Sequence, residues 1–348
     1  MNRSLLSSLI VYATLLVASL GWAYQTWTHE DELALSDQVV LLPGTPEQLA
    51  SVVYRSKDLE LTLEFREDEL GRYAWGRAVP LGEAAEPPEP PVVPEGQEPP
   101  PPLPAPEPEE FKVGKVGDPA VEALAPFVAK RRLEGVATDD LAALGLAEPE
   151  ATLEITRTGK EAKVYELGSN VFGGAAVYLR DPADGALYLV EARLLRPLLG
   201  GARSLGDRDL SGIDERKVER VVLHVDDREA SFTQHNPDDA DANYWSVTGD
   251  DTESAEVAAW VRKALRLRST RYVQPDENMV DLAAAFAFDV YGEDSGAVRI
   301  EVLRNFDDEG QEQFFARSSY TRGLVRLPRS AVAEVSADLE TALLAGGA

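Results

Sequence analysis

The feature that most constrains the fold is an uncharged apolar run near the start of the chain. No acidic or basic side chain occurs from Ser4 to Thr28, and Leu5–Tyr24 supplies about twenty residues for a helix. A helix of that length, rising about 1.5 Å per residue, spans the roughly 30 Å hydrocarbon core of a bilayer. We therefore predict a transmembrane anchor helix within residues 1–30, with these anchor residues: Leu5, Leu16, Trp22 and Tyr24.

The residues that flank this run predict its orientation. Arg3 precedes it, acidic residues follow at 30–32, and aromatic rings gather at Trp22–Trp27, where they favour the membrane interface. The positive-inside tendency keeps the N-terminus in the cytoplasm and exports the rest. A cleavable signal peptide is the alternative, because Gly21–Ala23 has small residues where a signal peptidase reads them. The run is longer than the usual apolar region of about 7–15 residues, which favours an uncleaved anchor. A buried core helix is disfavoured because the run is apolar on all sides.

A Pro/Glu-rich segment at residues 80–110 interrupts the chain. It contains no Lys or Arg. Because Pro lacks an N–H and the Glu side chains repel one another, we expect polyproline II structure or disorder there. We interpret the segment as a spacer inserted into a surface loop, which loop-closure entropy tolerates. A docking peptide for an aromatic-lined groove is the alternative, since a PxxP pattern occurs in it.

The parts of the chain around this insertion predict an internal repeat. Leu49–Phe65 resembles Val218–Gln234. The aligned apolar pairs are Val52 with Val221 and Leu63 with Phe232. Apolar spacing then predicts one helix that carries Leu124, Phe127 and Val128, and a second over Val257–Leu265. Hairpins follow at 152–167 and 298–317, and closing amphipathic helices at 194–199 and 332–343.

These patterns predict an α+β fold. An N-terminal transmembrane helix precedes two tandem, duplicated units of mostly antiparallel sheet packed with short helices. The predicted domains are an anchor at 1–30, a first unit at 36–205 that the segment 80–110 interrupts, and a second unit at 206–348. An accidental similarity between two β-rich stretches is the alternative to duplication.

Three stretches in the middle of the chain resemble a known family. Asp140–Ile155, Val177–Leu199 and Arg203–Gly212 are similar to the segments of DUF4340, a family of domains of unknown function. The link Gly206–Asp209 departs from the usual form of that family. The resemblance implies a single membrane anchor and an envelope accessory protein, because such proteins are often encoded beside ABC-type transporter subunits of the gliding-motility kind. It implies no catalytic residues.

Composition and motifs exclude several function classes. The chain has 34 Lys+Arg against 61 Asp+Glu and a net charge of −27, which argues against a nucleic-acid partner because such binding needs cations to neutralise phosphates. It has no Cys, so thiolate metal sites and Cys nucleophiles are excluded. It also lacks the GxSxG, HExxH, P-loop and GxGxxG motifs, which would indicate catalysis or nucleotide binding. We therefore predict no enzymatic activity, no catalytic residue and no cofactor.

The candidate metal and proton-transfer residues have simpler interpretations. Asp239, Asp241 and Asn243 have an alternate spacing that suits Ca²⁺, but Tyr244 stands where the loop needs a Gly. We interpret this stretch as a solvated hairpin loop, with Ca²⁺ binding as the alternative. We interpret His29 as a residue at the membrane interface. We interpret His224 as a strand residue that is solvated or hydrogen-bonded, and His235 as a polar loop residue.

A basic cluster stands out in this acidic chain. It consists of Arg262, Lys263, Arg266, Arg268 and Arg271. We interpret it as a solvated helix face. The alternatives are a contact for an acidic partner surface and an internal set of ion pairs with the excess carboxylates.

Together these observations predict a single-pass protein of a bacterial inner membrane whose bulk lies in the periplasm. We expect a non-catalytic scaffold or accessory protein beside an ABC-type transport complex, with the permease or other envelope proteins as partners. One alternative is a receptor that binds glycan or peptide in a groove between the two units, and another is a hydrolase with a carboxylate pair. A pocket lined by Trp75, Trp245 or Trp260 favours ligand binding, whereas burial of these residues in cores favours the scaffold.

Overall fold

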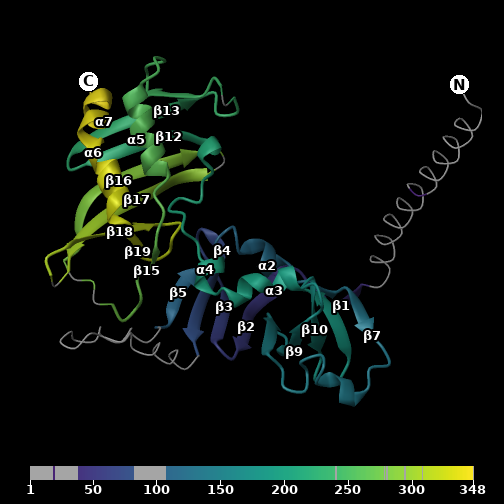
Figure 1. The fold of residues 1–348 in the computed structure, drawn as a ribbon. Helices are drawn as coiled ribbons and strands as arrows, with labels where there is room; N and C mark the ends of the chain where they lie inside the picture. The colour runs from purple at the N-terminus through teal and green to yellow at the C-terminus, as the bar shows by residue number, and fades with distance from the viewer. Residues whose placement is uncertain are drawn as a thin grey trace, which may run out of the picture. The chain divides into compact units, whose positions relative to one another are not determined.

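The computed structural model describes residues 38–81, 107–239, 241–277, 281–293, 295–307 and 309–347, with Ser19 and Met279. These residues form mostly antiparallel sheets with a few short helices, as Figure 1 shows. The sheet-dominated α+β class is therefore confirmed. The chain divides into two compact units, residues 1–49 with 120–196 and residues 50–119 with 197–348. This division differs from the predicted one, in which the first unit ends at residue 205, and the predicted boundaries stay a prediction.

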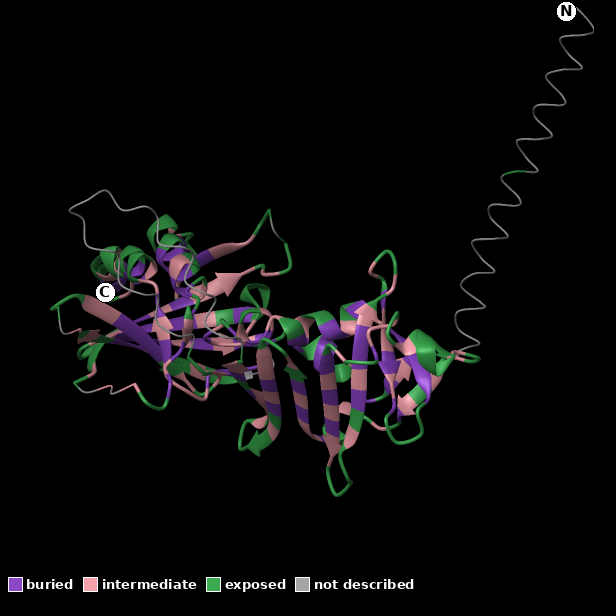
Figure 2. Cartoon of the chain, turned by 60° about the horizontal axis from the view of Figure 1, so that its bottom comes forward, coloured by how far each residue is buried: buried purple, intermediate pink, exposed green. Residues whose placement is uncertain are grey.

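The first compact unit contains two sheets. A small one pairs β1 (Val39–Leu42) with β6 (Phe127–Ala129). The other has the antiparallel order β8-β9-β10-β11-β7. Its strands are β7 (Arg131–Leu133), β8 (Ala151–Arg157), β9 (Lys163–Asn170), β10 (Ala176–Arg180) and β11 (Leu187–Glu191), with short 3-10 helices at Pro46–Gln48 and Thr138–Leu141. Burial alternates along β8, where every second side chain faces the core, and Figure 2 shows such banding along the strands.

The second compact unit begins with an antiparallel meander in the order β5-β4-β3-β2. The strands are β2 (Leu49–Ser56), β3 (Leu59–Asp68), β4 (Gly71–Pro80) and β5 (Glu109–Lys112). The short helix α4 (Ala202–Leu205) packs on β4 and β5. Two further short helices, α2 (Asp118–Glu122) and α3 (Ala192–Leu199), lie at the boundaries of the unit in the chain.

The same unit contains a larger sheet in the order β14-β13-β12-β16-β17-β18-β19-β15. Helices α5, α6 and α7 gather beside it in Figure 1 and contact β14, β18 and β13 respectively. Ser254 caps α5 by accepting the N–H of Val257, as favoured at this position. The bounds are β12 (Val218–Val225), β13 (Arg228–His235), β14 (Tyr244–Val247), α5 (Ala255–Leu265), β15 (Arg271–Tyr272), β16 (Ala283–Gly292), β17 (Ser295–Phe306), β18 (Glu312–Ser318), β19 (Val325–Leu327), α6 (Arg329–Ala337) and α7 (Leu339–Gly346), with a 3-10 helix at Glu215–Lys217.

Two parts of the chain have similar strand pairing, and the duplication itself stays a prediction. The meander β2-β3-β4 pairs Val52 with Leu63, and the meander β12-β13-β14 pairs the aligned Val221 with Phe232. The later strands also correspond, because β8 to β11 pair in sequence and end on β7, while β16 to β19 pair in sequence and end on β15. In the chain, β7 comes before the strands β8 to β11 that it joins, and β15 comes before the strands β16 to β19 that it joins.

One predicted helix is wrong. Leu124, Phe127 and Val128 do not share a helix face, because α2 ends at Glu122 and Phe127 begins β6. Pro126 explains the difference, since it lacks an N–H and disfavours helical backbone at the residue before it. Phe127 is fully buried and packs edge-on against Tyr165. The counterpart helix is confirmed as α5 and the first closing helix as α3. The second closing helix, predicted as one helix at 332–343, is two helices, α6 and α7, which meet at Asp338.

The predicted anchor and most of the predicted insertion lie outside the described residues. The anchor residues Leu5, Leu16, Trp22 and Tyr24 belong to this part of the chain, as does His29. Within the described ranges, we find no helix that has both the length and the apolar character needed to cross a membrane.

Candidate functional site

A buried ion pair marks the candidate site in the second compact unit. The Nζ atom of Lys112 lies 2.7 Å from Oδ2 of Asp207, and the two residues are only 5% and 8% exposed. Removing two charges from water is costly, so a buried pair is tolerated only where further hydrogen bonds satisfy it. The residues around this pair supply them.

Backbone pairing places the two charges together. Lys112 ends β5, opposite Trp75 on β4. Asp207 follows α4, and its N–H donates to the carbonyl of Lys112 at 2.8 Å. Gly114 lets this approach happen, because a Cβ at that position would lie 2.8 Å from the Cα of Asp207. The ion pair is therefore held by the main chain on both sides.

Tyr320 completes the cluster from the loop after β18. Its hydroxyl donates to Oδ2 of Asp207 at 2.6 Å, and its ring centroid lies 3.6 Å from Nζ of Lys112. The N–H of Asp209 donates to the other carboxylate oxygen. Gly212 faces the tyrosine ring with φ of 71°, and a Cβ there would come within 2.1 Å of a ring carbon, so the position requires Gly.

Tyr320 holds its proton tightly. Burial raises the pKa of Tyr320 far above its usual value, and its hydrogen bond to the Asp207 carboxylate raises it further. Tyr320 therefore stays a hydrogen-bond donor at neutral pH. Both carboxylate oxygens of Asp207 are occupied, so the arrangement is suited to joining β5, the 206–210 link and the 318–321 loop.

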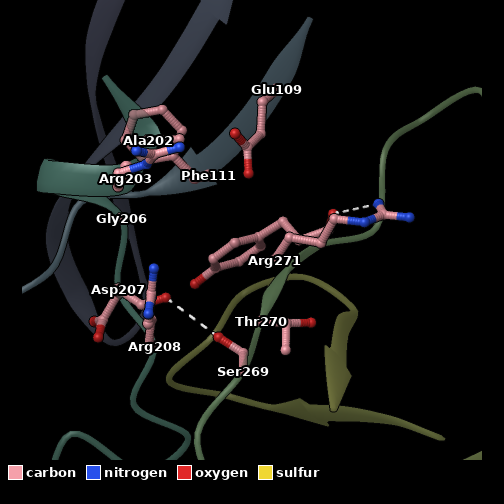
Figure 3. A pocket seen from close by; sticks show the side chains of 11 residues that line it. Glu109, Phe111, Ala202, Arg203, Gly206, Asp207, Arg208, Ser269, Thr270 and Arg271 are labelled. Carbon is pink, nitrogen blue, oxygen red and sulfur yellow. Dashed lines mark hydrogen bonds between the residues drawn. The ribbon is translucent and has the colours of Figure 1, made fainter. Parts of the chain in front are cut away.

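Two cavities adjoin this cluster. Asp207 lines one of about 160 Å³, shown in Figure 3. Lys112 and Tyr320 line a second of about 740 Å³, together with Tyr73 and Arg322. The guanidinium of Arg322 lies over the Tyr73 ring and pairs with Asp68. The walls of the larger cavity thus contain aromatic rings and the cations Lys112 and Arg322, each of which is paired with a carboxylate.

The predicted basic cluster is tied to carboxylates of its own unit. Lys263 pairs with Asp338 at 2.6 Å and donates to it from α5. The further ion pairs are Arg266 with Glu215 at 4.0 Å, Arg268 with Asp209 at 3.7 Å and Arg271 with Glu277. These contacts match the internal ion-pair interpretation of the cluster. Arg262 is exposed on α5, and a role of the cluster in partner binding stays a prediction.

The predicted histidines are engaged within the larger sheet. His224 on β12 lies 2.8 Å from Asp289 of β16 through its Nε2 atom. His235 ends strand β13 and does not lie in a loop; it stacks on Tyr244 and lies 2.8 Å from the Ser246 hydroxyl. The extended backbone continues to residue 235 because the strand is paired there with β14.

The predicted calcium ligands do not converge. The carboxylate of Asp239 accepts the N–H groups of Asp241 and Ala242, which makes it a turn cap. Asp239 and Asp241 are exposed, and Asn243 is half-buried. In the described ranges no group of three or more His, Asp or Glu side chains is arranged to hold a metal.

The tryptophans separate into core and partly exposed positions. Trp245 and Trp260 are buried in the larger sheet and its helices. Trp75 on β4 is half-buried, donates its Nε1 hydrogen to Glu110 at 3.1 Å and packs edge-on against Tyr272. None of the three lines either cavity described above.

Sequence reasoning missed the cluster of Lys112, Asp207 and Tyr320. Asp207 lies in the link Gly206–Asp209, and Tyr320 lies in the predicted second unit, but no local pattern at either position indicates a buried charge. Lys112 and Asp207 are 95 residues apart in the chain. No spacing rule joins such positions, and neither charge stands out in its own stretch, because Glu110 lies near Lys112 and Arg208 follows Asp207.

A pH-dependent contribution to stability is expected from Glu277, which accepts from Nη2 of Arg271 at 2.8 Å. The hydrogen bond from Arg271 lowers the pKa of Glu277. The contribution of Glu277 to the free energy of unfolding is therefore complete above its unfolded-state pKa of about 4.3. This contribution is lost as the pH falls through its lower pKa in the folded state. We expect Glu277→Gln to cost about 1 kcal/mol at pH 7, because the pair is partly exposed. Urea unfolding should show the difference vanish as the pH falls below about 4; a constant difference would contradict the prediction.

Comparison with known proteins places part of the chain in a family. The family model described as domain of unknown function (DUF4340) matches residues 109–284, which is half of the chain. No curated protein and no solved structure matches the chain. The matched range contains Lys112 and Asp207 and ends within β16.

Proposed function

Since this chain belongs to the DUF4340 family of domains of unknown function, we propose its role from its own residues. The protein acts as a single-pass, membrane-anchored scaffold or accessory protein without catalytic activity. Its body lies outside the cytoplasm, in the periplasm of a bacterium, and it associates with an ABC-type transport complex of the gliding-motility kind. The family resemblance supports the anchor and the transporter, and the physical observations below support the scaffold.

The observation that carries the proposal is that charged side chains form ion pairs and hydrogen bonds within their own unit. Asp207 binds Lys112 and Tyr320 with both carboxylate oxygens occupied. The basic residues of and after α5 pair with carboxylates of their own unit. Burial of Trp245 and Trp260 in the core also favours a scaffold over a receptor with an aromatic-lined groove. A protein that positions others needs such rigidity.

Duplication accounts for the architecture of the body. The recurring strand order and the matched registers of Val52 with Leu63 and Val221 with Phe232 support two copies at 36–205 and 206–348. The apolar run at Leu5–Tyr24 supplies the anchor, and the acidic Pro/Glu-rich segment at 80–110 supplies a spacer within the first copy.

Removal of residues 1–30 tests the anchor. We expect the intact chain to sediment with membranes and to need detergent for release, and the truncated chain to remain in the supernatant, because about twenty apolar residues are lost. Deletion of 82–106 is the matched control, since it removes a similar length without apolar character, and that variant should stay with the membranes. Recovery of the intact chain in the supernatant would overturn the anchor.

Affinity purification of the intact chain from detergent-solubilised membranes tests the partner. Co-purification of an ABC-type permease subunit is expected. Recovery of the chain without any transporter component would overturn the proposed association and leave the anchor untouched.

A further inference from the structure

The cavity of about 160 Å³ beside Asp207 is small and polar. Residues from β5, α4, the 206–208 link and the 269–272 segment surround it, as Figure 3 shows. Its volume is close to that of about five water molecules and below the roughly 300–1,000 Å³ of pockets for drug-sized ligands. A molecule that fills it must therefore have few atoms.

One wall contains a buried donor without an acceptor. Tyr272 lines the cavity and is 3% exposed, and its hydroxyl donates to no acceptor among the described residues, although the backbone N–H of Lys112 faces its oxygen. Burial, together with the charge of Asp207, raises the pKa of Tyr272 far above its usual value. The hydroxyl therefore keeps its proton. A buried unsatisfied donor costs stability and calls for an explanation, such as a ligand that accepts from it.

The walls also carry charged side chains of both signs, of which Arg203 and Arg208 are exposed and Glu109 lies within electrostatic reach of Arg271. Arg203 and Arg208 line the cavity from α4 and the link, and Glu109 lines it from β5; Figure 3 shows all three around the same space. In the ranges described above, these three side chains form no ion pair with each other or with another residue. Arg271, which also lines the cavity, is by contrast bound to Glu277.

We infer that this cavity binds a small zwitterion of the α-amino-acid class. Its carboxylate accepts from the Tyr272 hydroxyl and from Arg208, and its ammonium group pairs with Glu109. A simple anion supplies no ammonium group for the Glu109 carboxylate, and a simple cation leaves the Tyr272 hydroxyl without an acceptor. This inference goes beyond the scaffold proposal and does not depend on it.

Calorimetric titration of the full-length protein in detergent tests the inference. The probes are L-serine as the zwitterion, acetate as the carboxylate alone and methylammonium as the cation alone. We expect L-serine to bind at least about tenfold more tightly than either fragment, which is about 1.4 kcal/mol. Tyr272→Phe and Glu109→Gln should each weaken L-serine binding by about tenfold or more.

Matched controls separate the cavity from general effects. Tyr291→Phe changes a hydroxyl on β16, and Arg262→Gln changes an exposed cation on α5; neither lines the cavity, so both should bind L-serine as the unchanged protein does. Tyr272→Phe removes a hydroxyl that has no acceptor and keeps the ring, so its melting temperature should change little. Absence of L-serine binding up to about 10 mM, equal binding of acetate, or unchanged affinity in Tyr272→Phe and Glu109→Gln would each overturn the inference.

Discussion

Replacing Asp207 with alanine is expected to lower the free energy of unfolding by about 3–5 kcal/mol, because it leaves the ammonium group of Lys112 buried without its counter-charge. Lys112 is 5% exposed and sits 2.7 Å from the carboxylate that would be lost. The Tyr320 hydroxyl and the N–H of Asp209 lose their acceptor in the same change. This single substitution therefore leaves one buried cation and two half-buried donors without an acceptor.

A double variant distinguishes the loss of a counter-charge from the loss of packing. Lys112→Met with Asp207→Leu removes both charges and keeps apolar volume, so it should be clearly more stable than Asp207→Ala. Glu60→Ala is the surface control: its pair with Arg55 is exposed, and its loss should cost less than about 1 kcal/mol. Urea unfolding followed by circular dichroism measures all three. Equal costs for Asp207→Ala and Glu60→Ala would contradict the structural role of the buried pair.

The hairpins could be predicted from the sequence because their information is local. Alternating apolar residues and a turn determine a strand pair, so the hairpins at 152–167 and 298–317 were found. The sequence alignment also predicts the strand register. Val52 pairs with Leu63, and the aligned Val221 pairs with the aligned Phe232. Local periodicity failed around Phe127, where Pro126 ends helical structure that the apolar spacing alone permits.

The candidate site could not be predicted in the same way. Lys112 and Tyr320 reach Asp207 from positions 95 and 113 residues away. Their meeting depends on how β5, the 206–210 link and the 318–321 loop pack, which no spacing rule describes. The charge of the basic cluster was visible in the sequence, but its carboxylate partners were not, because Asp338 and Glu215 lie far from α5 in the chain.

Replacing Trp260 with alanine is expected to cost about 3–5 kcal/mol, because it opens a cavity where α5 packs on the larger sheet. Trp260 is fully buried, and its ring lies 5.7 Å from that of Phe232 on β13 and 6.1 Å from that of Phe288 on β16, between centroids. The aromatic contacts thus join the helix to two strands. Loss of this side chain removes both contacts at once.

Trp260→Phe should cost much less than Trp260→Ala. The indole Nε1 of Trp260 is buried without a hydrogen-bond partner among the described residues, so the phenylalanine removes an unsatisfied donor while it keeps an aromatic ring, and the two effects oppose each other. Leu344→Ala on α7 is the control, since Leu344 is exposed and its loss should stay within about 0.5 kcal/mol. Thermal unfolding followed by near-ultraviolet circular dichroism measures the series. Similar costs for Trp260→Ala and Leu344→Ala would mean that α5 does not anchor the helical layer to the sheet, and the rigid body required of a scaffold would lose its support.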